Sequence, residues 1–424
     1  MLEKLRLENF KNFRNAELSI GPLTLLVGTN ASGKSNIRDA FRFLHGVSRG
    51  YSLAEIIGEK WVEGGVLQWK GIRGGTREAC FDGLSRFALE ASFSIEDKSK
   101  LTNAAYRIEV DVGDNGKAPR VTAERLVVSG RGPYVFDTHP KGKTLNQYSD
   151  DHIAASVPSL GKGRPNDIDF NNTKPILSQV VENNLVKSPA ARELVRISLQ
   201  ALSPMRFLDL STDAMRVPSL PGQTILGDRG ENLSSVLQAI CKSSEQEQVL
   251  TQWVQELTPM DAERFEFPAD QTGKILLTLI EKNGQRISAH SASDGTLRFL
   301  AMIAALLGPE PARFYFFEEL ENGLHSTRLH LLLQLIEKKV SEGKIQMAAT
   351  THSPYLLGLL SEKSLKHASL VYRLDGKSDA RIKRILDIPN AKRLLKKKED
   401  FASLLSAGWF EDAINFTDEP DNEK

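Results

Sequence analysis

Apolar and polar residues follow two different spacings along the chain, and the change from one to the other predicts its secondary structure. The run "LTLLV" (23–27) is almost wholly apolar, which is typical of a strand buried on both faces. In "SNIRDAFRFLHGV" (35–47) the apolar residues recur at helical spacing, as on the buried side of a helix. The sequence therefore predicts a strand, a short glycine-containing loop and a helix in succession.

Other segments alternate apolar and polar residues, which is typical of half-exposed antiparallel strands. The pattern returns late in the chain, where "KILLTLIEKNGQRISAH" (274–290) predicts a hairpin that turns at Asn283-Gly284. The early alternating segments are "KLRLENF" (4–10), "AELSI" (16–20), "RFALEASFSIE" (86–96) and "AAYRIEVDV" (104–112).

The middle of the chain has a different pattern. Residues 131–170 are rich in Gly, Pro, Asn and Asp, and we expect a long irregular insertion there. From 175 to 260 the spacing becomes helical, as in "ARELVRISLQAL" (191–202). The patterns divide the chain into residues 1–130, 131–260 and 261–424. They predict an α/β fold with a mixed sheet core, an antiparallel β lobe and a partly helical insertion.

Composition narrows the class of protein. The chain has 424 residues, of which 40% are hydrophobic and 26% charged, as in ordinary globular proteins. Two cysteines, Cys80 and Cys241, stand without metal-ligand spacing and exclude a disulfide scaffold. The longest apolar stretch (299–308) is too short to span a bilayer, and the N-terminus lacks the apolar block of a signal peptide. We expect a cytoplasmic protein without a membrane partner.

The loop between the first strand and helix has the spacing of a phosphate-binding loop. Gly28 and Gly33 let backbone N–H groups converge on phosphate oxygens without interference from Cβ atoms. Lys34 reaches the β- and γ-phosphates of a nucleotide, and the Ser35 hydroxyl is placed to ligate Mg²⁺. The alternative is a glycine turn that binds nothing. The predicted nucleotide-binding residues are Gly28, Thr29, Asn30, Ala31, Ser32, Gly33, Lys34, Ser35 and Asn36.

Hydrolysis needs carboxylates near the phosphates, and a second strand supplies them. "RFYFFEELENGLH" (313–325) contains four large apolar residues followed by Glu318 and Glu319, where a buried strand emerges. We assign Glu318 to Mg²⁺, directly or through water, and Glu319 to polarising the attacking water. Taken alone, the pair is equally well explained as two solvated glutamates at a strand end.

Two more segments complete the candidate site. The strand in "IQMAATTHSPYLL" (345–357) stops near His352, which can donate a hydrogen bond to the γ-phosphate or to the attacking water. "SDGTLRFLAMIAALLG" (293–308) reads as a long apolar helix that opens with Ser293, Asp294 and Gly295. We expect its N-terminus to be a second anion-binding site; the alternative is that Ser293 is only the N-cap.

These motifs, in this order, resemble the ABC-type ATPases of the RecF, SMC and OLD group. "LRLENFKNFRNAELSIGPLTLLVGTNASGKSN" is similar to the opening strand, "NFK-F" turn and Walker A loop of that group. "SASDGTLRFLAMIAALL" resembles its signature helix, "FYFFEELENGLH" its Walker B strand with the D-loop, and "ATTHSPYLL" its histidine switch. Gln68 is the match to the Q-loop glutamine, a metal-contacting residue, and is otherwise an ordinary surface glutamine.

The resemblance implies a P-loop NTPase fold of the ABC type that binds and hydrolyses ATP with Mg²⁺. It implies two such heads in a homodimer, with ATP held between residues 28–35 of one chain and residues 293–295 of the other. A higher oligomer stays open. The chain departs from the pattern at Glu318, where the group usually has Asp. It also departs at Leu320 and Ser326, where close relatives more often have Pro, and at Thr296, where transporters have Gln. We therefore expect slow hydrolysis.

Fewer residues of the sequence bear on the partner on which such an ATPase acts. OLD-type relatives carry a Toprim nuclease after the ATPase, and the roughly seventy residues that follow His352 are too few for it. We therefore expect no nuclease activity in this chain. Residues 381–398 hold eight basic side chains against one acidic, which favours either a nucleic-acid or acidic-partner contact or simply a solvated helix.

The sequence is compatible with three functions. The first is an ATPase that switches a separately encoded effector, a nuclease or a toxin, in bacterial defence against phage. The second is a RecF-like repair ATPase that clamps DNA directly. The third is a nucleotide-gated scaffold with little turnover.

Overall fold

A computed structural model describes residues 1–113, 116–145, 150–159, 166–203, 205–257, 261–324, 326–353, 355–374, 376–389 and 391. The chain divides into two compact units, and each contains segments that are far apart in the sequence. Among the described residues, the first unit comprises those within 1–21, 28–205 and 369–384, and the second comprises those within 22–27, 206–368 and 385–391. Among the described residues, no helix combines the length and apolarity that a membrane span requires.

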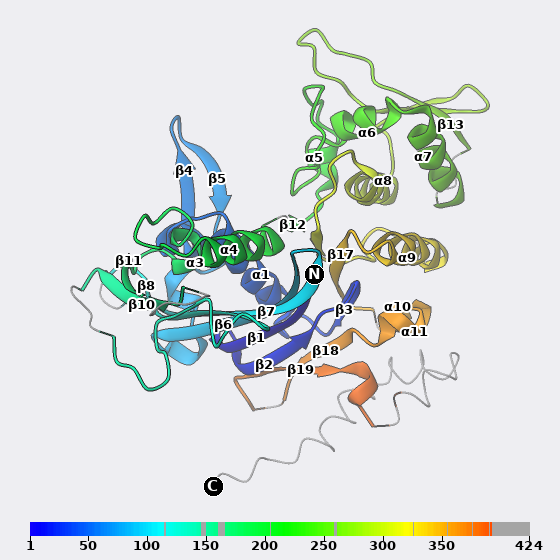
Figure 1. Ribbon diagram of the computed structural model, residues 1–424. Coiled ribbons are helices and arrows are strands. Elements are labelled where there is room, and N and C mark those ends of the chain that lie inside the picture. Colours follow the sequence, from blue (N-terminus) through cyan, green and yellow to red (C-terminus); the bar gives the residue numbers. More distant parts are fainter. Residues whose placement is uncertain are drawn as a thin grey trace. The chain divides into compact units, whose positions relative to one another are not determined.

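An eight-stranded sheet forms the centre of the first unit, with the strand order β11-β10-β9-β8-β7-β6-β1-β2 (Figure 1). Neighbouring strands of this sheet pair antiparallel. The early alternating segments of the sequence form β1, β2, β6 and β7, and their apolar side chains are part of the core. The bounds are β1 (Leu2–Phe10), β2 (Phe13–Ser19), β6 (Arg86–Asp97), β7 (Lys100–Asp111), β8 (Arg120–Val128), β9 (Phe136–Asp137), β10 (His152–Val157) and β11 (Asn166–Asn171).

Four helices and two hairpins accompany this sheet. Helices α1 (Lys34–Ser48), α3 (Ile176–Gln179) and α4 (Pro189–Leu202) pack together, and α4 contacts β6 (Figure 1). α2 (Leu53–Ile57) has a capping box between Ser52 and Glu55. The hairpins are β4 (Glu59–Val62) with β5 (Val66–Lys70), and β18 (Ala368–Arg373) with β19 (Ala380–Arg384); short 3₁₀ turns lie at Gly75–Glu78 and Phe81–Gly83.

The second unit is built on strands β12 (Met205–Leu208), β16 (Phe314–Phe317), β17 (Gln346–Thr351) and β3 (Leu23–Val27), in that order. β17 pairs in parallel with both β16 and β3. Every residue of the last three strands is buried, as the continuous apolar runs predict for parallel strands covered on both faces.

Helices and a small sheet complete the second unit. α8 (Asp294–Leu307) contacts α6 (Leu233–Cys241), and α7 (Ser244–Leu257) contacts α9 (Ser326–Ser341). The small sheet contains β13 (Ala262–Glu266), β14 (Thr278–Glu281) and β15 (Arg286–Ser288), and its last two strands are the hairpin expected at Asn283-Gly284. The remaining helices are α5 (Thr212–Met215), α10 (Tyr355–Leu359), α11 (Glu362–Leu365) and a 3₁₀ turn at Ile385–Asp387.

One expectation about the fold was wrong. Part of the segment 131–170, expected to be irregular, forms β9, β10 and β11, which extend the eight-stranded sheet. Ser156 in β10 lies opposite Asp137 in β9, and β9 pairs in turn with β8. The sheet edge offered by β8 supplies hydrogen-bond partners that a local pattern rich in turn residues does not reveal.

A buried carboxylate, Glu124 in β8, links three elements of the first unit. It accepts hydrogen bonds from the backbone N–H groups of Ile176 (2.6 Å) and Leu177 (2.7 Å) at the start of α3, and from the hydroxyl of Tyr106 (2.9 Å) in β7. Burial raises the pKa of Glu124 to about 7, and these three donors oppose the rise. Because α3 contacts α1, Glu124 helps to position the helix that follows the glycine loop.

We expect Glu124→Gln to change how stability depends on pH. The pKa of Glu124 rises from the ordinary 4.5 to about 7 on folding, so the folded chain takes up a proton between these values and stability falls as the pH rises through them. The fall is about 3 kcal/mol, and it is absent in the variant because an amide does not titrate. Urea unfolding at about pH 5 and about pH 8 measures it.

Glu3→Gln, at an exposed glutamate, is the control and should keep the pH dependence of the parent. The interpretation of Glu124 is wrong if the parent and Glu124→Gln lose the same stability between the two pH values.

Candidate functional site

The glycine loop connects β3 to α1 in a conformation that needs its glycines. Gly33 is the N-cap of α1 and has a φ of 117°, a region that residues with a Cβ rarely adopt. A Cβ on Gly28 would overlap the carbonyl oxygen of Val371 in β18. No side chain caps the N-terminus of α1. The backbone N–H groups of the first turn of α1 therefore point toward the loop, as an anion site requires.

The Lys34 side chain lies within this loop. Its ammonium donates hydrogen bonds to the carbonyl oxygens of Gly28 (2.6 Å) and Thr29 (2.7 Å), and the residue is 6% exposed. A single positive charge is thus held among backbone dipoles next to the helix N-terminus. This arrangement suits a polyphosphate, because a lysine ammonium interacts with phosphate oxygens as a point charge.

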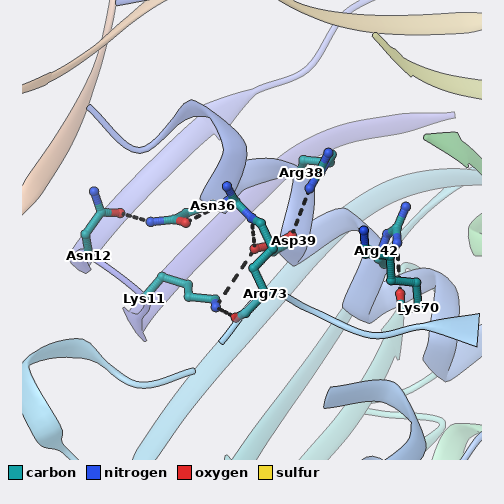
Figure 2. Close-up of polar contacts among 8 residues, drawn as sticks. All are labelled: Lys11, Asn12, Asn36, Arg38, Asp39, Arg42, Lys70 and Arg73. Atoms are coloured by element: carbon teal, nitrogen blue, oxygen red, sulfur yellow. Dashed lines mark hydrogen bonds and ion pairs between the residues drawn. The ribbon is translucent and has the colours of Figure 1, made fainter. Parts of the chain in front are cut away.

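A cluster of cations surrounds Asp39, one turn along α1 (Figure 2). Asp39 is 1% exposed, and its carboxylate lies 3.0 Å from Arg73 Nε, 3.8 Å from Arg38 Nη2 and 3.9 Å from Lys11 Nζ. Lys11 also donates to the carbonyl oxygen of Arg73. Asp39 therefore holds together the β1–β2 turn, α1 and the segment after β5.

Lys11 is itself buried within this cluster. Burial lowers its pKa, and the carboxylate of Asp39 opposes that shift. Next to it, Asn12 accepts a hydrogen bond from the amide of Asn36 (2.7 Å), and Arg73 donates to the Asn36 oxygen (2.9 Å) (Figure 2). Asn12 also donates to the carbonyl oxygen of Ser32 (3.4 Å), so the cluster contacts the phosphate loop directly.

The second unit brings Glu319 and His352 together. Glu319 Oε1 lies 3.7 Å from His352 Nε2, and Glu319 Oε2 accepts a hydrogen bond from the side-chain amide of Asn322 (3.1 Å). The backbone N–H of Glu319 donates to the Thr350 hydroxyl (3.0 Å). Glu319 has a φ of 52°, which is rare for a residue with a side chain. Such a strained backbone conformation persists only where the surrounding structure enforces it.

Strand register explains why these two side chains meet. β16 ends just before Glu318 and β17 ends just before His352, and the two strands run parallel with Phe317 opposite Ala349. In β3, Val27 lies opposite Thr351. Parallel strands that end together project their following residues at one sheet edge, which is where ligands bind in such folds. The phosphate loop starts at the residue after Val27.

Ser293 stands at the start of α8, where both interpretations of the sequence place it. The Ser293 hydroxyl accepts a hydrogen bond from the Thr296 N–H (3.2 Å), so Ser293 is the N-cap of α8. Asp294 forms an ion pair with Arg216 (2.7 Å). A Cβ on Gly295 would overlap the carbonyl oxygen of Gly323, so the start of α8 and the loop after Glu319 are in backbone contact.

The structure gives the remaining predicted residues different positions. Gln68 is exposed on β5, within the β4–β5 hairpin. Asn36 is occupied by the hydrogen bonds with Asn12 and Arg73. Of the basic segment 381–398, residue 390 and residues 392–398 lie outside the described residues, as do His325 and the C-terminal tail.

Four residues of the site were given no role from the sequence: Lys11, Asn12, Asp39 and Arg73. Lys11 and Asn12 belong to the "NFK-F" turn, so the motif was a signal for them, although it does not reveal their partners. Asp39 stands on the apolar face of a helical pattern, where a carboxylate needs a buried partner. Arg73 had no signal, because its contacts depend on the tertiary fold.

The oxygen donors at Ser35 and Glu318 suit Mg²⁺, which keeps several waters and shares phosphate oxygens rather than using an all-protein cage. The described residues contain no group of three or more His, Cys, Asp or Glu side chains that could hold a metal ion by themselves.

Comparison with known proteins supplies a family. The sequence matches, over residues 23–358, the family described as "AAA domain, putative AbiEii toxin, Type IV TA system". This span includes the phosphate loop, Ser293, Glu319 and His352.

The individual proteins that are similar to this chain have low sequence identity to it. An "ATP/GTP phosphatase" of Helicobacter pylori is 22% identical over 390 residues, which is 88% of this chain and 92% of that protein. Among solved structures, an SMC head bound to the C-terminal winged-helix domain of ScpA is similar with a TM-score of 0.47 and 14% identity, covering 90% of this chain and 97% of that one. The SMC head domain from Thermotoga maritima has a TM-score of 0.40 and 12% identity, covering 91% and 98%.

We expect Asp39→Asn to destabilise the first unit by about 3–5 kcal/mol, because it leaves Lys11, Arg38 and Arg73 without the buried charge that they share. Urea unfolding measures the loss. Glu17→Gln is the control, because it breaks the ion pair between Glu17 and Lys4 (2.9 Å). The side chain of Lys4 is 48% exposed and that of Glu17 is 54% exposed, so the free energy of unfolding should fall by less than about 1 kcal/mol. Equal losses in the two variants would contradict a central role for Asp39.

We expect Gly295→Ala to lower the thermal stability of the second unit, because the added methyl group forces the start of α8 away from Gly323. Such overpacking costs about 1–3 kcal/mol. Gly358→Ala in α10 is the matched control, since a Cβ there meets no atom within 4 Å, and its melting temperature should equal or exceed that of the parent. If Gly295→Ala melts like the control, the two loops do not need their close backbone approach.

Proposed function

Because the chain belongs to the family of AAA domains that it matches over residues 23–358, we propose that it is an ATP-driven switch in which two copies close on ATP and separate after hydrolysis. The chain is an ATPase with the P-loop fold of the ABC type, as the four motifs predicted, and nucleotide is its substrate. The dimer, the residue roles and the partner are the proposed parts.

The observation that carries the proposal is the common edge at which β3, β16 and β17 end. Val27 lies opposite Thr351, so the phosphate loop starts beside the strand that leads to His352. At the same edge Glu319 and His352 are 3.7 Å apart. Phosphate binding and water activation need this combination of an anion site, a carboxylate and a hydrogen-bond donor.

In the proposed reaction a water molecule attacks the γ-phosphorus, and the bond between this phosphorus and the β–γ bridging oxygen breaks to leave ADP and phosphate. Glu319 accepts a hydrogen bond from the attacking water and orients it, and His352 donates to a γ-phosphate oxygen. Asn322 and Thr350 hold the side chain and backbone of Glu319 in place. Lys34 contacts the phosphate chain from the loop.

Mg²⁺ is the proposed cofactor, held by Ser35 and Glu318, and when bound it neutralises charge on the phosphate oxygens. Glu318 stands where the related ATPases more often have Asp. Its longer side chain reaches the metal through one more methylene group, which is a reason to expect slow turnover.

Closure of a dimer gives a role to Ser293, Asp294 and Gly295. α8 has 14 residues, and its N-terminus is a site of partial positive charge. We place it against the γ-phosphate bound to the other copy. Because Gly295 touches Gly323 in the loop after Glu319, movement at this N-terminus is transmitted to the water-orienting carboxylate. ATP occupancy would then be coupled to the state of both heads.

The preferred setting is defence against phage, with a separately encoded nuclease or toxin as the partner. The family description names a putative toxin of a type IV TA system, which favours a role of this kind. The alternatives are direct clamping of DNA, as in RecF-like repair, and a scaffold with little turnover. We place the protein in the cytoplasm, where ATP is available.

Glu319→Gln tests the switch. The variant should bind ATP, hydrolyse it at least about 100-fold more slowly, and accumulate as a dimer in size-exclusion chromatography with ATP and Mg²⁺. Glu362→Gln, at an exposed glutamate of α11, should behave like the parent. Turnover of Glu319→Gln at the parent rate would refute the role of this carboxylate, and a monomer with ATP would refute the dimer.

The same variant separates the alternatives. Direct clamping predicts ATP-dependent DNA binding that weakens steeply with salt. An effector switch predicts little DNA binding by the chain alone and a protein that co-purifies with the ATP-trapped dimer. A scaffold predicts co-purification that does not change when ATP is hydrolysed.

A further inference from the structure

The loop after β16 carries another glutamate, Glu321, whose side chain reaches the backbone of His352. Glu321 Oε1 accepts a hydrogen bond from the His352 N–H (2.8 Å), although the two residues are 31 positions apart in the sequence. Neither the predicted site residues nor the proposed reaction include Glu321. Its carboxylate nevertheless holds the backbone of one of the two residues assigned to the chemistry.

Two backbone turns fix the direction from which this side chain extends. The Asn322 N–H donates to the carbonyl oxygen of Glu319 (3.0 Å). The Leu324 N–H donates to the carbonyl oxygen of Glu321 (3.0 Å), and Gly323 within this turn has a φ of 75°. The Glu321 side chain therefore extends from a backbone that local hydrogen bonds already hold.

Backbone donors of the same loop also bind the end of β17. The Glu319 N–H donates to the Thr350 hydroxyl (3.0 Å), and the Leu320 N–H donates to the Thr350 carbonyl oxygen (3.1 Å). Both bonds fix β17 two residues before His352. The bond from Glu321 acts on His352 itself, at the point where the chain has left the strand.

The two oxygens of Glu321 differ in their surroundings. Oε1 accepts the bond from His352, whereas Oε2 is buried and has no hydrogen-bond partner among the described residues. Burial of a carboxylate oxygen costs desolvation free energy, and a single hydrogen bond to the other oxygen does not offset it. Stability alone therefore does not favour a carboxylate here, and its effect on His352 explains the side chain better.

The bond bears on the distance between the two side chains that are assigned to the reaction. His352 Nε2 lies 3.7 Å from Glu319 Oε1. Without Glu321, the His352 backbone would lose a restraint just beyond the end of β17, and its ring could move relative to Glu319. A displacement of about 1 Å in a group at a reaction centre can slow the reaction about 100-fold.

We propose that Glu321 is a positioning residue, which sets the place of His352 relative to Glu319 by holding the His352 N–H. The proposal rests on the proposed role of His352 at the γ-phosphate and does not require the dimer. It gives one loop three tasks, since Glu319 orients the water, Glu321 holds the histidine and Gly323 contacts the start of α8. Glu321 acts on the chemical step rather than on nucleotide affinity.

The first test compares Glu321→Ala with Glu337→Ala in the full chain. Glu337 in α9 is the matched control, because its half-buried carboxylate also accepts a backbone N–H, that of Ser361 (2.9 Å), in the same unit. We expect Glu321→Ala to lower kcat about 10–100-fold and to change the dissociation constant of the non-hydrolysable analogue AMP-PNP less than about 3-fold. Glu337→Ala should keep the kcat of the parent. An unchanged kcat in Glu321→Ala, or an equal loss in the control, would overturn the proposal.

Two conservative variants separate the hydrogen bond from the charge. Glu321→Gln keeps an acceptor oxygen at the same reach and should recover most of kcat, which also shows that the loop is folded. Glu321→Asp keeps the charge, but it is shorter by one methylene group and should be nearly as slow as Glu321→Ala. A Glu321→Gln variant as slow as Glu321→Ala would overturn the proposal, because the hydrogen bond would then not be what matters.

A double-mutant cycle shows whether Glu321 acts through His352. If it does, the kcat of Glu321→Ala/His352→Ala equals that of His352→Ala within about 3-fold. Losses that multiply would mean that the two residues act separately and would contradict the proposal. Parent turnover in His352→Ala would refute the proposed role of His352 and this inference with it, whereas a slow His352→Ala beside an unaffected Glu321→Ala would refute only the positioning role.

Discussion

Parallel pairing of β3 with β17 is the constraint on which the candidate site depends. Because Val27 lies opposite Thr351, β3 and β17 end at the same edge of the sheet. β3 continues into the phosphate loop, and β17 continues to His352. β16 ends at the same level and delivers Glu319. A shift of β17 by one residue would turn its buried side chains over and separate Glu319 from His352.

Close backbone contacts transmit this alignment to the loops. Gly28 fits against Val371, and Gly295 fits against Gly323, in both cases where a Cβ would collide with a carbonyl oxygen. Glu319 adopts a φ of 52° without being glycine. Backbone strain of this kind is retained when the surroundings over-determine the residue, and the Thr350 hydroxyl provides part of that restraint on Glu319.

Buried charges hold the first unit around the phosphate loop. Asp39 joins three basic residues from separate segments, and Glu124 holds the start of α3 through two backbone N–H groups. A buried ion pair contributes little net stability compared with apolar packing, but removal of one partner is costly. The effect is to allow one arrangement of the β1–β2 turn, α1 and the segment after β5 and to penalise others.

The sequence by itself determined the strand–loop–helix unit, the buried strands at 314–317 and 346–351, and the chemistry expected at Lys34, Glu319 and His352. These features depend on local spacing, residue type and motif order, which are visible without a fold. Only the tertiary structure decided that β9–β11 extend the sheet and that Asp39 forms ion pairs with Lys11 and Arg73. It also decided that residues of the β18–β19 hairpin line one cavity with residues 29–32 of the phosphate loop. Such contacts join segments tens to hundreds of residues apart, and no local pattern specifies which distant partner satisfies a strand edge or a buried charge.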